Sequence, residues 1–285
     1  VKVWNAGRDE TIVKHSQATA GVPVDDITMP TNDPFFAQDA LEIGYSSIKP
    51  AEDPHYVAIG MPRKYFPNST IEDNEILSRR FAKENGFGYY FMHYIGGTTT
   101  LGDNFGGNLE TIPPYEGAPL GRIVIGDNAA EWLRSFFIRQ EVQTPIVDVD
   151  LSPLGLGHID ELITFIPKNI PGESGKYMLA IINPESGLQE YRDLIAGDYP
   201  ELALQIDVNA VEAQQQLYID ACEEIEAQII ATGVVAATDV IEIPGFFLTD
   251  DGGTIYLSGD HELWTANPVN MIVIGNHAIF ADSLT

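Results

Sequence analysis

Cysteine is nearly absent from this sequence, which has Cys222 and no other cysteine among its 285 residues. A single cysteine excludes an internal disulfide framework and any zinc site that needs several thiolates. Cys222 falls within a predicted helix, beside Ala221 and near Ile225. Such neighbours are typical of a buried structural thiol rather than of an activated nucleophile.

Basic residues are also scarce: 15 Lys and Arg stand against 42 Asp and Glu, which gives a formal net charge of −27. This balance argues against a nucleic-acid partner, because phosphate contacts require clustered Lys and Arg. An acidic surface attracts cations, including calcium and arginine-rich substrates, through long-range electrostatic steering. An equally good interpretation is that the acidity only keeps the protein soluble.

Long apolar runs are missing too, and no stretch of the sequence is long enough to span a bilayer. The first residues do not have the pattern of a signal or transit peptide, although a chain that begins with Val is consistent with removal of upstream residues. One N-glycosylation sequon, Asn68-Ser69-Thr70, favours secretion, but such triplets also arise by chance. A secreted and a cytoplasmic location therefore both stay open.

The hydrophobic periodicity predicts an α/β protein in which strands and helices alternate. Strands are expected at 1–4, 24–29, 55–61, 89–94, 122–126, 145–149, 177–182, 253–257 and 271–274. Helices are expected at 10–20, 73–85, 129–140, 188–196 and 208–230, with Asp127 as the N-cap of the third. In the last helix an apolar side is predicted at Val211, Leu217, Ala221, Ile225 and Ile229. No linker divides the chain, so we expect a single domain over 1–285.

Residues 153–167 bring glycines, an imidazole and a carboxylate together ahead of an apolar run. If this run is a strand, residues two apart point to the same face, and His158 and Asp160 address one pocket. The alternative, which spacing alone favours, is a core histidine beside a solvated acid. A buried element is expected to follow, formed by Leu162, Ile163, Phe165 and Ile166 and ended by Pro167.

Two further stretches carry oxygen ligands of the kind that hard cations prefer. A long glycine-rich loop ends at residues 106–110, where exposed backbone carbonyls precede the carboxylate of Glu110. Earlier in the chain, strand alternation would place Gln38 and Glu42 on one face and Asp39 on the other. Asp39 could then face a pocket while the other two face a cation. A plain edge strand with a polar outer face is the alternative.

Five segments, taken in order, resemble the protein-arginine deiminases. They are QDALEIGY at 38–45, GNLE at 107–110, PLGRIVIG at 119–126, GHIDE at 157–161 and VNMIV at 269–273. Because the segments cover nearly the whole chain, the resemblance implies the fold of that family. This fold is the pentein, a five-bladed α/β propeller, here with its last blade incomplete.

The resemblance implies a hydrolase that converts peptidyl-arginine to citrulline and ammonia. Asp39 and Asp160 would clamp the planar guanidinium, which has donors on several edges, and His158 would be the general acid and base. The family's cysteine nucleophile lies in a His-Cys-Gly-Thr-like segment near its C-terminus. The present sequence ends before such a segment, and Cys222 does not replace it, so we expect the nucleophile to lie downstream.

The resemblance also implies one calcium ion and two substrate contacts. The calcium ligands would be the side chains of Gln38, Glu42 and Glu110, with the carbonyls of Gly106 and Leu109. A second calcium site of the family is expected to be lost, because Ala40 stands where that site needs an acid. Phe36 would form an apolar wall for the substrate's aliphatic stem, and Arg63 would contact the substrate.

Two other functions stay open at this stage. One is a deiminase for a small guanidine such as agmatine, which the loss of a calcium site leaves possible. The other is a non-enzymatic, acidic, calcium-binding propeller that recognises arginine side chains through Asp39 and Asp160.

Overall fold

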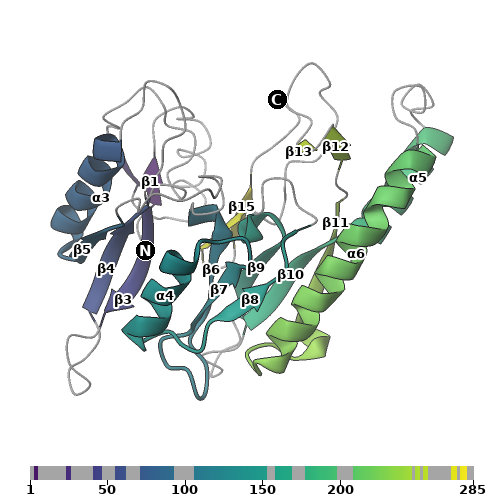
Figure 1. The fold of residues 1–285 in the computed structure, drawn as a ribbon. Helices are drawn as coiled ribbons and strands as arrows, with labels where there is room; N and C mark the ends of the chain where they lie inside the picture. Colours follow the sequence, from purple (N-terminus) through teal and green to yellow (C-terminus); the bar gives the residue numbers. More distant parts are fainter. Residues whose placement is uncertain are drawn as a thin grey trace.

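The computed structural model describes residues 3–5, 24–26, 41–46, 55–61, 71–92, 106–152, 158–168, 177–197, 208–245, 248–250, 253–255, 271–274 and 277–280. Within these ranges the chain is an α/β protein built around three small mixed sheets. Figure 1 shows helix α3 (Ile71–Asn85) at one side and helix α6 (Val208–Ala231) at the other, with the sheets between them.

The same arrangement of strands recurs in all three sheets. In the first, β3 (Leu41–Ser46) pairs antiparallel with β4 (His55–Gly60), and β4 pairs parallel with β5 (Gly88–Phe91). Helix α3 makes the crossover between the two parallel strands, because parallel neighbours cannot be joined by a tight hairpin. Each sheet is therefore a strand–strand–helix–strand unit.

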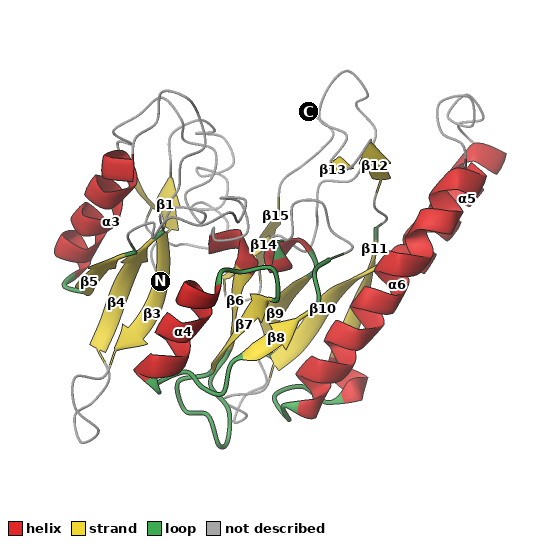
Figure 2. Cartoon of the chain, in the orientation of Figure 1, coloured by secondary structure: helices red, strands yellow, loops and turns green. Residues whose placement is uncertain are grey.

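The second unit consists of β6 (Leu109–Ile112), β7 (Arg122–Gly126), α4 (Glu131–Gln140) and β8 (Val147–Val149). The third consists of β9 (Ile163–Pro167), β10 (Tyr177–Asn183), helices α5 (Pro184–Ala196) and α6, and β11 (Val240–Pro244). In both, the first two strands are antiparallel and the last two are parallel. Figure 2 shows α3 at one side of the sheets and α5 and α6 at the other, with α4 between the first sheet and the second.

Three pairs of short strands complete the described part. Strands β1 (Val3–Asn5) and β2 (Val24–Asp26) are parallel. Two antiparallel pairs follow the third unit: β12 (Leu248–Asp250) with β13 (Gly253–Ile255), and β14 (Met271–Ile274) with β15 (His277–Phe280). Three 3₁₀ turns, η2 (Gly106–Asn108), η3 (Ile159–Glu161) and η5 (Ala237–Asp239), lie between strands.

Strand β7 separates two hydrophobic cores. Ile123 and Ile125 belong to a core shared with the first unit and α4, whereas Val124 belongs to a core shared with the third unit. Successive residues of a strand face opposite sides, so an unbroken apolar run is what a strand covered on both faces requires. This explains why the predicted strand at 122–126 matches β7 at both ends.

The apolar side of α6 differs from the prediction. Leu217 is 62% exposed, whereas Tyr218, Cys222, Ile225 and Ile229 are buried in the core of the third unit. The prediction for Leu217 was therefore wrong: the buried position is the next residue, Tyr218. One residue corresponds to a rotation of about 100° around the helix axis. Leu217 and Tyr218 are neighbours in the sequence, and both have apolar surface to bury. Their hydrophobicity alone does not decide which of the two faces the core.

The predicted cap of α4 was also wrong. The helix begins at Glu131 with Ala130 at the N-cap, which makes no side-chain capping bond. Asp127 instead accepts a hydrogen bond at Oδ1 from the backbone N–H of Leu151, at 3.2 Å. It thereby ties the turn after β7 to the segment after β8. The helix predicted at 10–20 lies outside the described residues.

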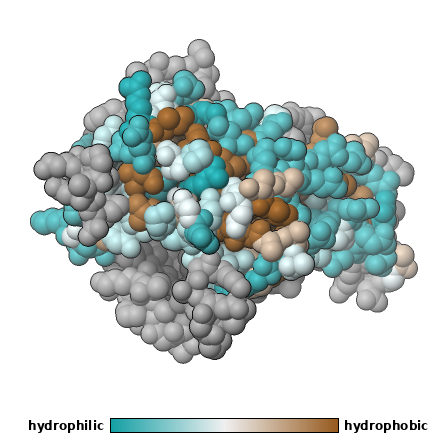
Figure 3. All heavy atoms as spheres, turned by 90° about the horizontal axis from the view of Figure 1, so that it is seen from below, coloured by the Kyte–Doolittle hydropathy of each residue, from teal (hydrophilic) through white to brown (hydrophobic). Residues whose placement is uncertain are grey.

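A cavity of about 230 Å³ lies between the first and second units. Aromatic rings of both units line it, including Tyr45, Tyr90, Phe136 and Phe137, and among the described residues no charged side chain does. Tyr90 and Phe136 stack with ring centroids 4.6 Å apart. Seen from below, the molecule shows apolar surface among hydrophilic side chains (Figure 3). No described helix is long and apolar enough to cross a membrane.

Candidate active site

His158 and Asp160 lie in a turn rather than in a strand. His158 has an extended backbone, with φ −104° and ψ 128°, and it immediately precedes η3, which contains Asp160. The N–H of Leu162 donates to the carbonyl of Ile159 at 3.0 Å, which closes the turn, and β9 begins only at Ile163. The strand alternation expected to point both side chains to one face was therefore wrong, although the buried element after them is confirmed.

Three ionisable side chains within the four residues 158–161 are buried. His158 is 4% exposed, Asp160 is 7% exposed and Glu161 is 3% exposed. Moving a carboxylate or an imidazolium out of water costs free energy unless neighbouring groups compensate it. Acids and histidines are rarely buried for stability alone, so their concentration in one turn indicates a functional site.

The glycine-rich turn η2 packs directly against η3. Gly107 lies on the imidazole of His158: a Cβ at residue 107 would be 2.4 Å from Nδ1 and 3.0 Å from both Cε1 and Cγ. Any side chain there would displace the ring, so glycine is needed for this close approach. The structure thus brings the predicted metal loop and the predicted acid–base residue into contact.

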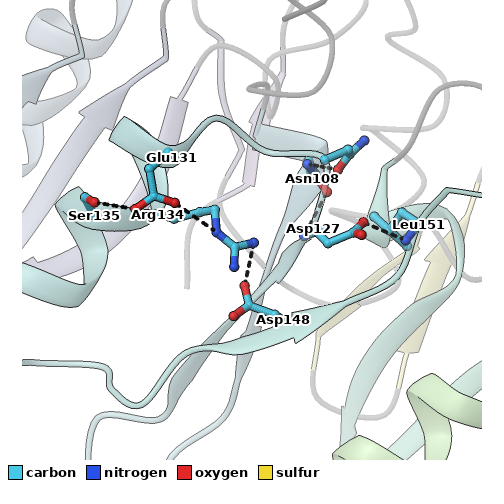
Figure 4. A network of polar contacts seen from close by, with 9 residues as sticks. Asn108, Asp127, Glu131, Arg134, Ser135, Asp148 and Leu151 are labelled. Atoms are coloured by element: carbon cyan, nitrogen blue, oxygen red, sulfur yellow. Dashed lines mark hydrogen bonds and ion pairs between the residues drawn. The ribbon is translucent and has the colours of Figure 1, made fainter.

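Asn108 fixes this turn to the end of β7. Its side chain is fully buried, and its Nδ2 donates to Oδ1 of Asn128 at 2.9 Å. Its Oδ1 accepts from the backbone N–H of Gly126 at 3.1 Å. Figure 4 shows Asn108 and the Asp127–Leu151 hydrogen bond at the same end of β7.

Glu110 carries a disfavoured negative charge. It lies on β6 opposite Val124 and is half-buried, and its Oε1 accepts from the N–H of Thr111 at 2.9 Å. Burial raises the pKa of Glu110 to about 7, and the Thr111 N–H only partly opposes this. A nearby cation would favour the ionised form, so this carboxylate fits a hard-cation ligand.

The described residues contain only part of the expected calcium set. Gly106, Leu109 and Glu110 are adjacent on η2 and β6, whereas Glu42 lies on β3 in the first sheet. Among the described residues, no group of three or more His, Cys, Asp or Glu side chains could hold a metal ion. Four predicted site residues lie outside the described ranges: Phe36, Gln38, Asp39 and Arg63.

Two buried residues of this region were missed as site residues by sequence reasoning. Asn108 and Glu161 both lie within motifs that the sequence displays, GNLE and GHIDE, yet neither was predicted to shape the site. Their burial is the informative signal, and it depends on contacts between segments far apart in the chain.

The chain matches known proteins over most of its length. Residues 11–222 match the family described as protein-arginine deiminase (PAD). This chain belongs to the protein-arginine deiminase family.

Several curated deiminases are related to the chain at low identity. Protein-arginine deiminase type-1 of Mus musculus is 27% identical over 273 residues, which cover 84% of this chain and 37% of the relative. Protein-arginine deiminase type-4 of Homo sapiens is 25% identical over 276 residues, which cover 86% of this chain and 38% of the relative. The chain therefore spans a little over a third of the length of these deiminases.

Solved structures of a second enzyme also resemble the chain. C. jejuni agmatine deiminase is 12% identical, with a TM-score of 0.45 over 90% of this chain and 62% of that chain. Its C315S variant with substrate bound has a TM-score of 0.46 at the same identity, over 98% of this chain and 68% of that chain.

Proposed function

We propose that this chain forms the acid–base and guanidinium-binding part of a calcium-dependent enzyme that hydrolyses peptidyl-arginine to citrulline and ammonia. One observation carries the proposal: the family's His-x-Asp pair, His158 and Asp160, is buried in a turn that packs against the oxygen-rich loop at 106–110. The strongly acidic chain is suited to a cationic substrate such as an arginine side chain.

In this reaction Asp160 and Asp39 hold the guanidinium and orient its central carbon. A cysteine thiolate from outside the present sequence attacks that carbon, and ammonia leaves with a proton donated by the His158 imidazolium. His158 then takes a proton from water, which attacks the thiouronium carbon. The C–S bond breaks, citrulline is released and the thiolate is regenerated.

The recurring units support a propeller as the complete fold. Each of the three units begins with an antiparallel strand pair and ends with a parallel pair. Strands β14 and β15 repeat the antiparallel pairing, and strands β1 and β2 repeat the parallel pairing. These partial units are consistent with a five-bladed α/β propeller of the pentein type, with its last blade incomplete.

A calcium ion held by Gln38, Glu42, Glu110 and the carbonyls of Gly106 and Leu109 completes the proposal. The ion would neutralise the carboxylates of Glu42 and Glu110, and Glu110 follows the turn in which Gly107 contacts His158. The half-buried carboxylate of Glu110 supports this assignment, because its charge is disfavoured in the protein alone.

The full-length protein tests the reaction directly. Incubated with calcium, it should form citrulline in an arginine-containing peptide and should release less ammonia from agmatine or free arginine. Ammonia release from the small guanidines without peptide citrullination would replace this proposal with a small-guanidine deiminase. Calcium and arginine binding without turnover of any substrate would favour a non-enzymatic binding protein.

The Asp160→Asn substitution tests the assigned site. It preserves the shape of the side chain and removes one charge of the guanidinium clamp, so turnover should fall by a factor on the order of 10³. Asp150→Asn is a suitable control, since Asp150 is exposed and its Oδ1 accepts a hydrogen bond from the neighbouring backbone N–H of Ser152 at 2.8 Å. Unchanged turnover in Asp160→Asn would remove this residue from the site.

A further inference from the structure

The side chain of Asn108 links two distant segments in a way that leaves little room for another residue. A Cβ at Gly126 would lie 2.3 Å from Oδ1 of Asn108 and 2.5 Å from Oδ1 of Asn128. The Asn108 amide therefore rests directly on the backbone at the end of β7. The amide uses its donor toward Asn128 and its acceptor toward Gly126, so both of its functions are engaged.

The residue before Asn108 contacts His158. Because Gly107 lies against the imidazole, the position of this backbone segment limits where the ring can lie. On the other side the turn containing Asp160 is held to the third sheet, since the N–H of Ile182 donates to the carbonyl of Leu162 at 3.0 Å. His158 thus lies between a backbone segment anchored to the second unit and a turn anchored to the third.

We propose that Asn108 is a positioning residue, which sets the location of the His158 imidazole by holding Gly107 against it. This inference rests on the proposed function of His158. Asn108 does not need to touch the substrate: its effect passes through one backbone segment. If Asn108 served only to stabilise the fold, removing its amide would leave the position of the His158 imidazole unchanged. A positioning role and a purely structural role can therefore be distinguished.

The first test is Asn108→Ala in the full-length protein with calcium. Removing both hydrogen bonds releases Gly107 from β7 and lets the His158 imidazole move. Displacing a catalytic group by about 1 Å can lower the rate on the order of 100-fold, so kcat should fall about 10- to 100-fold. KM should change less than about threefold, because Asn108 does not contact the substrate. The matched control is Asn85→Ala, which removes an amide that donates to the carbonyl of Phe81 at 2.9 Å at the end of α3. The control should keep wild-type kcat.

A second variant covers the case in which Asn108→Ala does not fold. Gly107→Ala leaves the Asn108 hydrogen bonds in place and adds a methyl group 2.4 Å from Nδ1 of His158. It should lower kcat to a similar extent. Gly88→Ala is its control, because a Cβ there would meet its nearest atom, the carbonyl oxygen of Tyr56, at 3.4 Å, an ordinary contact.

Nuclear magnetic resonance of ¹³C-labelled histidine gives a readout that does not depend on turnover. The His158 ring signals, assigned by their loss in His158→Gln, should shift in Asn108→Ala and Gly107→Ala and stay in place in both controls. If wild-type protein makes no citrulline but these shifts occur, the proposed function fails and the positioning role stands. Unshifted His158 signals in the folded variants would overturn the positioning role, whatever the activity.

Discussion

The two ends of strand β7 differ sharply in chemistry. At its last residue, Gly126, lie the buried amide of Asn108 and the turn that holds His158. Near its first residues, Ile123 borders the aromatic cavity, whose lining in the described part of the chain has no charged side chain. A five-residue strand is only about 15 Å long, so the two environments are close neighbours in one sheet.

This difference is the one we expect between residues that hold the fold and residues of the proposed catalytic site. The aromatic end joins two units by packing, where size and shape determine the contribution. The polar end buries an imidazole and two carboxylates at a cost that packing does not repay. We therefore expect substitutions at the polar end to affect turnover more than stability, and substitutions at the aromatic end to do the reverse.

The largest effect should come from His158→Gln at the polar end. Without the proposed general acid and base, turnover of an arginine peptide should fall by a factor of about 10² to 10⁴. A neutral polar residue of similar volume should cost less than about 2 kcal/mol of unfolding free energy. Citrulline assays and urea unfolding of the full-length protein measure the two quantities. A variant with normal turnover and low stability would reverse the assignment of the two ends.

At the aromatic end, Phe137→Ala should lower the unfolding free energy by about 3 kcal/mol and leave kcat unchanged while the protein is folded. Buried Phe→Ala substitutions cost about 3–5 kcal/mol, and we expect the lower value because Phe137 already borders a cavity. Ile138→Ala is the control, since Ile138 is 49% exposed and should cost less than about 0.5 kcal/mol. Equal losses in the two variants would show that the cavity wall does not hold the units together.

The sequence predicts a helix or strand well where one pattern of apolar residues continues along the whole element. The strand at 122–126 contains the apolar run Ile123–Ile125, which is buried on both faces, and the strand at 271–274 was also predicted with the bounds of β14. The length of α6 was predicted within one residue, and Ile225 and Ile229 are buried as predicted, whereas Leu217 is exposed. Burying Tyr218 rather than Leu217 is decided by the shape of the core, which no local pattern contains.

For the candidate site, the sequence named residues but gave the wrong local geometry for them. Motif resemblance selected His158 and Asp160, whereas strand alternation gave the wrong local structure, because a single 3₁₀ turn has too few residues to show a period. The part played by Asn108 depends on Gly126 and Asn128, which are 18 and 20 residues away. Contacts of this kind arise only when the units pack, so composition and spacing cannot reveal them.

A smaller effect at the polar end concerns pH and calcium. The pKa of Glu110 is raised to about 7 in the folded chain, above its value near 4.5 in an unfolded chain, so the folded state binds the extra proton between these values. The free energy of unfolding that depends on the protonated form of Glu110 is therefore fully present below about pH 4.5 and is lost as the pH rises through 7. In calcium-free buffer, Glu110→Gln should therefore be more stable than wild type at pH 8, and equal to it near pH 4. The full pKa shift corresponds to about 3.4 kcal/mol, but Glu110 is only half-buried and solvent screens its charge, so we expect a difference of about 1 kcal/mol.

Calcium sharpens this test, because the ion stabilises the ionised carboxylate. Adding calcium at pH 8 should raise the thermal unfolding midpoint of wild type and have a smaller effect on Glu110→Gln. Thr111→Val is a useful control, because it changes the neighbouring exposed side chain and keeps the backbone N–H that Glu110 accepts from. Equal calcium responses in wild type and Glu110→Gln would exclude Glu110 as a ligand.

The smallest effect should come from Cys222→Ala, which tests whether the third unit contains any reactive group. Burial raises the pKa of the Cys222 thiol to about 12, and the carboxylates of Glu223 and Glu226 add to the increase. At pH 8 roughly one thiol in ten thousand is then ionised, so iodoacetamide should modify Cys222 in unfolded but not in folded protein, as read by mass spectrometry of its peptide. Cys222→Ala should cost about 1 kcal/mol of stability and leave turnover unchanged, because the thiol fills space in the core beside Ile225. Loss of turnover in a stably folded Cys222→Ala protein would mean that this thiol, rather than one outside the present sequence, attacks the substrate.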